Sequence, residues 1–328
     1  MHYNKPRVVW FNGEFIPESN ARVSIFDSAL MFGDMVFEMT RSFNKVQFKL
    51  REHLERLYFS LKSVHIPLDM HIDEMEKRVY ETIEANEPVF ESDDEHRIMI
   101  DVSRGLLSIY EDVVGVSKGP NVIIADFPLK WTVAGMGKLF EKGINAVIPS
   151  QRAIPGWLLD PKVKNRSRLH YLMANIEVSK YEGDDNWALL LDPDGFIAEG
   201  SGDNFFIVKE GKLLTPEPRN ILRGISRAYI FDLAKILKIP YEEKNIEPYD
   251  VITADESFMT GTPFCMLPVT SINSSKIGNG LMGPITRKLL DTWSETVGVD
   301  IKKQIQKWDT QCEKKLRSGP SPYSFKNV

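Results

Sequence analysis

The sequence predicts an α+β protein whose two domains pack together. Its 328 residues, 42% of them hydrophobic, exceed what one compact core usually holds. Strand-like runs and amphipathic helices do not alternate regularly along the chain, which favours layered α+β domains over a parallel βαβ sheet. No GxGxxG motif opens a helix after a strand, so we expect no Rossmann dinucleotide site.

Residues 1–128 predict a small N-terminal α/β domain. The dipeptide Asn12-Gly13 between two short apolar runs predicts a hairpin. Leucines at helical spacing predict an amphipathic helix that ends before Pro67. The elements expected in this domain are strands at 8–11, 15–17, 36–43, 46–48, 98–102 and 122–125, and helices at 50–64 and 72–84.

Residues 129–143 predict an interdomain connection with a helical piece, and residues 144–300 predict a larger, β-rich domain. Asp194-Gly195 and Glu210-Gly211 mark turns between its strands. Its expected elements are strands at 146–148, 187–191, 204–208 and 256–260, and helices at 167–181, 225–237 and 284–297. Residues 301–328 are polar, and the stretch 318–322 predicts a loose end.

The composition argues against several classes of protein. The 41 Lys+Arg and 46 Asp+Glu are spread out and give a net charge of −5, without the basic stripe of a nucleic-acid binder. Cys265 and Cys312 form no CxxC pair, which favours a reducing compartment, and we expect no metal site. Neither a signal peptide nor an apolar run of roughly 20 residues is evident, so we expect a cytoplasmic protein without membrane partners.

Lys164 is the first candidate for chemistry. Four cations fall within seven residues just before a predicted helix that Ser167 could cap: Lys162, Lys164, Arg166 and Arg168. A lysine amine is nucleophilic only when it is partly neutral, and nearby cations and burial both favour the neutral form. The pattern suits a lysine that bonds to a carbonyl compound, although a solvated basic loop would look the same.

Two charged side chains could face a cofactor. Glu199 ends an apolar run before three small residues, where a carboxylate could approach a ring nitrogen or simply cap a turn. Arg56 lies beside the apolar stripe of its helix. It could bind a phosphate with two hydrogen bonds, or pair with Glu52 on the surface.

Two backbone segments could hold a phosphate. Gly224 precedes an amphipathic helix, so the amides of Ile225 and Ser226 would favour an anion. Gly261 and Thr262 follow a strand and offer amides and a hydroxyl at a turn. Ordinary helix caps and turns have the same composition, so each signal is weak by itself.

The order of these segments resembles the fold-type IV family of pyridoxal phosphate (PLP) enzymes, which includes branched-chain aminotransferases, D-amino-acid aminotransferases and aminodeoxychorismate lyases. The matching series, within residues 8–293, is His53-Leu54-Glu55-Arg56-Leu57, Lys164, the Glu199-Gly200-Ser201 segment with Asn204, Leu222-Arg223-Gly224-Ile225-Ser226-Arg227, and Gly261-Thr262. The resemblance implies a small N-terminal and a larger C-terminal domain, a PLP cleft between them, and usually a homodimer.

Carried over by position, the resemblance makes Lys164 the Schiff-base lysine and proton carrier, Arg56 a phosphate ligand, and Glu199 the partner of the pyridine nitrogen. It implies further cofactor contacts from Tyr171, Leu222, Gly224, Ile225, Ser226, Gly261 and Thr262. Residues 31–38 resemble a strand that overhangs the substrate. Phe32 and Phe37 would then line the substrate pocket, with Arg41 nearby.

This chain also departs from the family pattern. His170 and Tyr171 follow Lys164 at a greater distance than in many relatives, so Lys162 stays open as the alternative lysine. Pro263 replaces a residue whose amide often helps to bind the substrate carboxylate, and proline has no N–H. Phe37 and the segment after Arg104 lack the polar groups of D-amino-acid aminotransferases, which disfavours that activity.

The resemblance and the apolar pocket predict a PLP-dependent aminotransferase with a ping-pong mechanism. Its partners would be an amino donor, branched-chain or otherwise apolar, and a keto-acid acceptor, and no nucleic acid. Two alternatives stay open. One is an aminodeoxychorismate lyase that releases pyruvate, and the other is a catalytically silent protein of the same shape that serves as a binding unit.

Overall fold

The computed structural model describes residues 6–311 except 117 and 184, so the expected loose end at 318–322, the first five residues and Cys312 lie outside the described residues. The chain divides into two compact units. Unit 1 comprises Met1–Trp131 and Val163–Arg168, and unit 2 comprises Thr132–Lys162 and Leu169–Val328. The short segment around Lys164 belongs to unit 1, although the residues before and after it in the sequence belong to unit 2.

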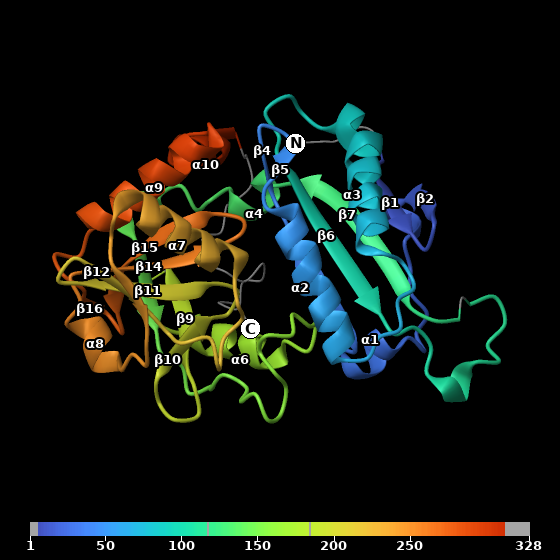
Figure 1. The fold of residues 1–328 in the computed structure, drawn as a ribbon, viewed down its shortest axis with the longest axis horizontal. Coiled ribbons are helices and arrows are strands. Elements are labelled where there is room, and N and C mark those ends of the chain that lie inside the picture. The colour runs from blue at the N-terminus through green and yellow to red at the C-terminus, as the bar shows by residue number, and fades with distance from the viewer. Residues whose placement is uncertain (1–5, 117, 184, 312–328) are drawn as a thin grey trace. The chain divides into compact units, whose positions relative to one another are not determined.

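Unit 1 is built on an antiparallel sheet in the order β2-β1-β7-β6-β3 (Figure 1). β1 and β2 form the predicted hairpin, and both Asn12 and Gly13 adopt the positive φ that such a turn requires. The strands are β1 (Val8–Phe11), β2 (Glu14–Pro17), β3 (Met35–Met39), β6 (His96–Ser103) and β7 (Asn121–Pro128).

Besides short 3-10 turns, unit 1 also contains α-helices and one small hairpin. They are α1 (Ser28–Phe32), α2 (Leu50–Ser63), α3 (Ile72–Asn86), β4 (Ser42–Phe43) and β5 (Val46–Gln47). The single strand expected at 36–43 is therefore interrupted at Thr40 and Arg41, between β3 and β4. The strand expected to overhang the substrate at 31–38 begins only at Met35, because the preceding residues form α1 and end at Gly33, which has a positive φ.

Helices α2 and α3 lie on one face of the unit 1 sheet (Figure 1). The predicted leucine stripe of α2 faces inward: Leu54 and Leu57 are fully buried. They share a core with Met75 and Val79 of α3 and with Ile100 of β6. The apolar residues spaced at helical intervals in α2 therefore form the buried face that their spacing predicted.

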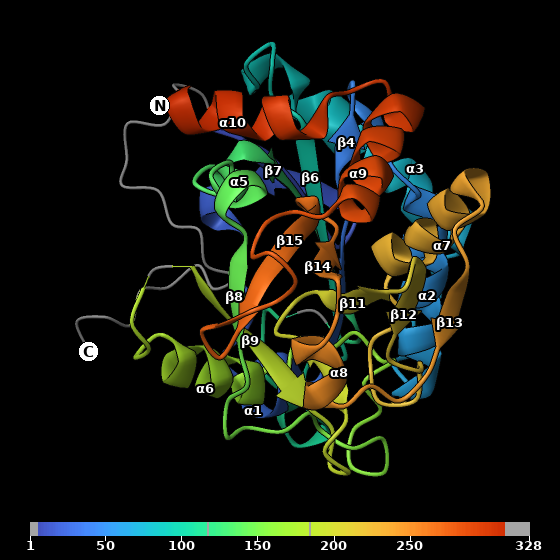
Figure 2. The same cartoon turned by 90° about the vertical axis from the view of Figure 1, so that its left-hand side faces the viewer.

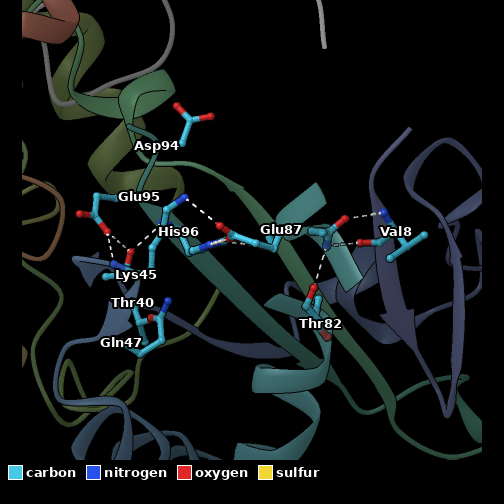
Figure 3. Close-up of polar contacts among 12 residues, drawn as sticks. Val8, Thr40, Lys45, Gln47, Thr82, Glu87, Asp94, Glu95 and His96 are labelled. Carbon is cyan, nitrogen blue, oxygen red and sulfur yellow. Dashed lines mark hydrogen bonds and ion pairs between the residues drawn. The ribbon is translucent and has the colours of Figure 1, made fainter. Parts of the chain in front are cut away.

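Unit 1 also buries polar groups beside this core. His96, at the start of β6, is fully buried, and its Nδ1 lies 2.8 Å from the Asp126 carboxylate. Its Nε2 lies 2.5 Å from the carboxylate of Glu87. Figure 3 shows His96 and Glu87 pointing toward each other. The neighbouring Glu95 accepts hydrogen bonds from the amides of Asn44 and Lys45. Buried polar groups are normally satisfied in this way, so the network helps to define the end of the sheet.

Unit 2 contains a second sheet in the order β10-β9-β8-β15-β14-β11-β12-β13, with β16 paired to β15. β10 also pairs with β11 through Glu199 and Asn204, so the strands from β10 round to β11 close into a ring. The strands are β8 (Ile144–Val147), β9 (Asn186–Leu191), β10 (Ile197–Gly200), β11 (Asn204–Lys209), β12 (Lys212–Thr215), β13 (Tyr241–Glu243), β14 (Glu256–Gly261), β15 (Cys265–Ile272) and β16 (Ser275–Lys276).

The helices of unit 2 pack around this sheet, and Figure 2 shows β8, β15 and β14 side by side with α9 beyond their ends. α7 and α9 contact each other and β14, whereas α6 contacts β9. The helices are α5 (Leu139–Lys142), α6 (Leu169–Val178), α7 (Ile225–Leu237), α8 (Pro248–Ile252), α9 (Pro284–Val297) and α10 (Ile301–Gln311), and the short α4 (Lys130–Val133) spans the boundary between the units.

Helix α10 corrects the expectation of a polar tail from residue 301. Ile305 and Trp308 are buried, and the Asp309 carboxylate accepts hydrogen bonds from the amides of Gly135 and Gly137 at 2.6 and 2.9 Å. The segment is mostly polar, but its few apolar residues lie on one buried face of an amphipathic helix. The described part of the tail therefore belongs to unit 2. None of the described helices is both long enough and apolar enough to cross a membrane.

Candidate active site

The segment 163–168 lies antiparallel to β3 in unit 1. The Phe37 amide donates to the Lys164 carbonyl at 2.9 Å, and the Arg166 amide donates to the Met35 carbonyl at 2.9 Å. A bridge between Val36 and Asn165 fixes the register. Side chains alternate along such a segment, so Lys164 and Arg166 point to the same side.

Gly33 lets this segment approach α1. A Cβ atom at Gly33 would lie 2.5 Å from the Ser167 hydroxyl oxygen, and Gly33 has φ +68. The Ser167 hydroxyl donates instead to the carbonyl oxygens of Phe32 and Gly33. The expected N-cap role of Ser167 is therefore wrong, because α6 begins only at Leu169 and Ser167 is used to dock the segment.

The Phe37 ring is surrounded by cations. The Lys164 ε-amine lies 4.7 Å from the ring centroid, and the guanidinium carbons of Arg166 and Arg168 lie 3.8 and 5.7 Å from it. The Lys162 amine instead pairs with Asp160 at 2.8 Å within unit 2. The two candidate lysines therefore have different environments, and Lys164 is the one that faces a buried aromatic ring.

Arg56 faces inward and does not form the surface pair with Glu52 that the sequence also allowed. Its Nε and Nη2 donate to the Glu38 carboxylate at 2.6 and 2.9 Å, and His53 Nδ1 lies 2.7 Å from the same carboxylate. Burial by itself raises the pKa of Glu38, but the charge of Arg56 and the contact with His53 lower that pKa well below its ordinary value. Burial lowers the pKa of His53, so Arg56 is the main countercharge of Glu38.

Glu199 lies in β10 of unit 2, where the ring of strands closes. Its carboxylate accepts three hydrogen bonds: from the Tyr171 hydroxyl at 2.8 Å, from the Asn204 side-chain amide at 3.1 Å, and from the Leu222 backbone amide at 3.0 Å. Glu199 is 5% exposed. Three donors from three different segments hold one carboxylate in a fixed orientation, which is what a partner for a protonated ring nitrogen requires.

The N-terminus of α7 follows directly. Gly224 is its N-cap residue and provides no capping side chain, and the first helical residues are Ile225 and the buried Ser226. A Cβ at Gly224 would lie 2.1 Å from the Asn204 side-chain oxygen, so a larger residue there would displace the Asn204 side chain that donates to Glu199. The first amides of a helix favour an anion, and here they lie next to the residues that hold Glu199.

The turn after β14 is the last predicted segment in unit 2. Gly261 is buried, and Thr262 and Pro263 begin the turn that leads into β15. A Cβ at Gly261 would lie 3.5 Å from the Gly202 carbonyl oxygen, so this turn packs against the loop after Glu199. Glu199, the α7 N-terminus and the Gly261-Thr262 turn thus come together within unit 2.

The predicted substrate residues have different surroundings within unit 1. Phe37 is 4% exposed, whereas Phe32 is 69% exposed at the end of α1. Arg41 is buried, and its guanidinium carbon lies 3.8 Å from the Phe43 ring centroid. The structure therefore brings Phe37 to Lys164 and gives Arg41 an aromatic partner of its own.

One relationship was missing from the sequence-based prediction: Arg166 pairs with Asp101 of β6 at 2.7 Å. The four cations in seven residues were a signal that this segment is unusual. Nothing in the sequence indicated Asp101 as the partner of Arg166, because Asp101 lies 65 residues earlier and is one acidic residue within a predicted strand.

A model of the family described as amino-transferase class IV matches residues 35–272, a region that includes β3, Lys164, Glu199 and Gly224. The chain belongs to the class IV aminotransferases. One relative comes from Methanocaldococcus jannaschii and has the name putative branched-chain-amino-acid aminotransferase. Its sequence is 38% identical to that of the present chain over 288 residues. The aligned part covers 88% of this chain and 95% of the relative.

Solved structures agree with this assignment. The branched-chain amino acid aminotransferase of Escherichia coli has a TM-score of 0.80 and 31% identity, covering 89% of this class IV aminotransferase and 94% of its own chain. The enzyme of the same name from Thermobaculum terrenum, solved in its PLP-form, has a TM-score of 0.76 and 28% identity, covering 93% and 97%. The predicted fold-type IV class and the predicted aminotransferase activity are confirmed, and the chain is an enzyme.

Proposed function

We propose that this class IV aminotransferase uses PLP, bound covalently through Lys164, to move amino groups between branched-chain or other apolar amino acids and a keto acid. The names of the relatives support the substrate class, and the PLP-form of the Thermobaculum terrenum structure supports the cofactor. Within the chain itself, the observation that carries the proposal is the environment of Lys164, whose amine faces the buried Phe37 ring.

The residues of unit 2 fit this cofactor. A phosphate dianion suits the N-terminus of α7, which has the Ser226 hydroxyl and no capping side chain at Gly224. A protonated pyridine nitrogen suits Glu199, because that buried carboxylate is held in place by three hydrogen bonds and can balance the positive charge. Leu222, Gly261 and Thr262 would complete the binding site, with Arg56 as an additional phosphate ligand.

When bound, PLP supplies an aldehyde that bonds to amines and a ring that withdraws electrons from the substrate carbon. The residues of the chain move the protons, position the cofactor and contact the substrate. Lys164 carries the proton between the substrate carbon and the cofactor, and Glu199 keeps a proton on the ring nitrogen. The Tyr171 hydroxyl donates to Glu199 and so holds that carboxylate in place. Phe37 and Phe32 offer an apolar wall to the substrate side chain.

The decisive experiment is borohydride reduction of the PLP-loaded protein followed by peptide mapping. We expect the reduced cofactor on Lys164. A label on Lys162 would transfer the role to that residue, and a bound cofactor that borohydride cannot attach would favour a catalytically silent protein. Assays with leucine, isoleucine and valine and a keto-acid acceptor then test the substrate class. Release of pyruvate from aminodeoxychorismate without an acceptor would identify the lyase instead.

We also propose that the functional enzyme is a homodimer, as the family likeness implies. Analytical ultracentrifugation of the PLP-loaded protein should give the mass of two chains at assay concentrations. A monomeric mass together with full activity would contradict this.

A further inference from the structure

Asp101 holds Arg166 from one side. The Arg166 Nε and Nη2 atoms both lie 2.7 Å from Oδ1 of Asp101. Asp101 is 7% exposed, and it lies directly opposite Phe37 in the register between β6 and β3. Burial raises the pKa of Asp101, and the charge of Arg166 opposes that effect, so the pair stabilises a carboxylate that would otherwise resist ionisation.

Phe37 supports Arg166 from another side. Its ring centroid lies 3.8 Å from the guanidinium carbon, the distance of close cation–π stacking. A guanidinium that is fixed by a carboxylate and by a ring loses little further conformational freedom when it binds an anion. Arg166 is therefore preorganised, unlike a typical exposed arginine.

Arg166 has hydrogen-bonding capacity left. Within the described chain, its bonds to Asp101 use Nε and Nη2, and no protein group accepts a hydrogen bond from Nη1. Its side chain is 31% exposed. Arg104 in the same unit differs, because its three nitrogens are used by Asp34, Val64 and His65. Arg166 can thus present a charged N–H edge to a small anion.

The position of this edge relates to Lys164. The Lys164 amine and the Arg166 guanidinium contact the same Phe37 ring, and the two residues point to the same side of one extended segment. A substrate amine that replaces the Lys164 amine carries its α-carboxylate two bonds from the nitrogen. A cationic partner close to that amine would bind the carboxylate of such a substrate strongly, and Arg166 is such a cation.

We propose that Arg166 binds the α-carboxylate of the amino-acid and keto-acid substrates and that Asp101 is its positioning residue. This inference rests on the role proposed above for Lys164. Arg166 then determines specificity for acids over the corresponding amines, which lack the carboxylate. Arg168 contributes less, because its guanidinium carbon lies farther from the ring, at 5.7 Å.

The test compares two inhibitors of the PLP-loaded enzyme that differ only in charge: 4-methylpentanoate, which resembles leucine without its amino group, and the neutral 4-methylpentanamide. In R166M we expect the inhibition constant of the acid to rise roughly 10- to 100-fold, as the loss of charged hydrogen bonds predicts, while that of the amide stays unchanged. KM for leucine should rise in parallel. R166K should recover part of the affinity, because it keeps the charge but not the planar fork.

The matched control is R168M, which removes one cation from the same segment and should change the acid inhibition constant far less. Equal losses in R166M and R168M would overturn the assignment to Arg166. An unchanged ratio of acid to amide inhibition in R166M would do the same, because a merely structural role does not distinguish the two inhibitors.

Two further measurements keep the outcomes separate. If R166M does not fold, the D101N/R166M variant removes both partners of the buried pair and is compared with D101N alone in the same inhibitor assay. Borohydride labelling of Lys164 is recorded for the wild type and each variant. Failure to label the wild type would contradict the proposed function, whereas normal labelling with unchanged acid affinity would contradict only the role of Arg166.

Discussion

Lys164 is fixed to Phe37 at two points. The Phe37 amide donates to the Lys164 carbonyl at 2.9 Å, and the Lys164 ε-amine lies 4.7 Å from the Phe37 ring centroid. Both contacts depend on the register between β3 and the segment 163–168. A shift by one residue would turn Lys164 to the opposite side and bring Asn165 into its place.

The first prediction separates the two candidate lysines. K164M should lower the rate of amino transfer from leucine roughly 10²- to 10⁴-fold, the usual cost of removing a group that carries a proton. K162M should stay close to the wild type, because the Lys162 amine pairs with Asp160 and with the Arg219 carbonyl. The half-reaction with leucine, followed by cofactor absorbance, measures both. Loss of activity in K162M alone would reverse the assignment.

The second prediction concerns the charge on Glu199. E199Q keeps the size of the side chain but replaces one acceptor oxygen by an NH₂ donor, which would face Tyr171, Asn204 or Leu222. A charged hydrogen bond contributes about 1.5–3 kcal/mol, so its loss in the transition state predicts roughly a 10- to 150-fold lower kcat. Steady-state kinetics with saturating PLP measures this. Y171F is the matched comparison: it removes one donor, leaves the charge, and should cost less.

The third prediction concerns Glu38 and the pH dependence of stability. The pKa of Glu38 is lowered from its ordinary value of 4.5, so the pair with Arg56 stabilises the folded protein above that pH and loses its effect as pH falls through the lowered pKa. Removing one partner of a buried pair typically costs about 3–5 kcal/mol, and E38Q should lose this amount at neutral pH. Urea unfolding measures it.

The control for E38Q is the pH profile itself. Below pH 4.5 the unfolding free energies of E38Q and the wild type should converge, because the advantage of the ionised carboxylate disappears. A difference between the two proteins that stays constant down to the most acid conditions would show that the ionisation of Glu38 contributes nothing to stability.

The local elements were largely predictable from the sequence. Helices α2, α7 and α9 followed from apolar periodicity, and α7 and α9 begin and end where expected, at Ile225–Leu237 and Pro284–Val297. Strand β15 was missed, because Pro268 within Cys265–Ile272 argues against a strand. In the structure Pro268 lies opposite Phe258, in a sheet whose other pairings hold the strand in place.

The contacts of the site were less predictable, because they join residues far apart in the sequence. The segment around Lys164 read as a basic loop just before a helix, yet it pairs with β3 more than a hundred residues earlier. The partner of Arg56 is Glu38, on a strand outside its own helix, where local spacing suggested Glu52. Resemblance to a family supplied the order of the site residues, but charge partners such as Asp101 depend on strand register, which one sequence does not specify.

The last prediction concerns His96, whose two ring nitrogens contact the carboxylates of Asp126 and Glu87. Burial lowers the pKa of His96, but the hydrogen bonds to these carboxylates raise it by more, so the pKa lies above its ordinary value of 6.5. A raised pKa stabilises the fold fully below pH 6.5, and this stabilisation is lost as pH rises through the raised pKa. H96N should therefore be less stable than the wild type at pH 6, and the difference should shrink as pH rises above 6.5. Urea unfolding measured from pH 6 upward gives the dependence of the unfolding free energy on pH. The matched control is H65N, which replaces an exposed histidine. The same slope in H96N and the wild type would show that folding does not raise the pKa of His96.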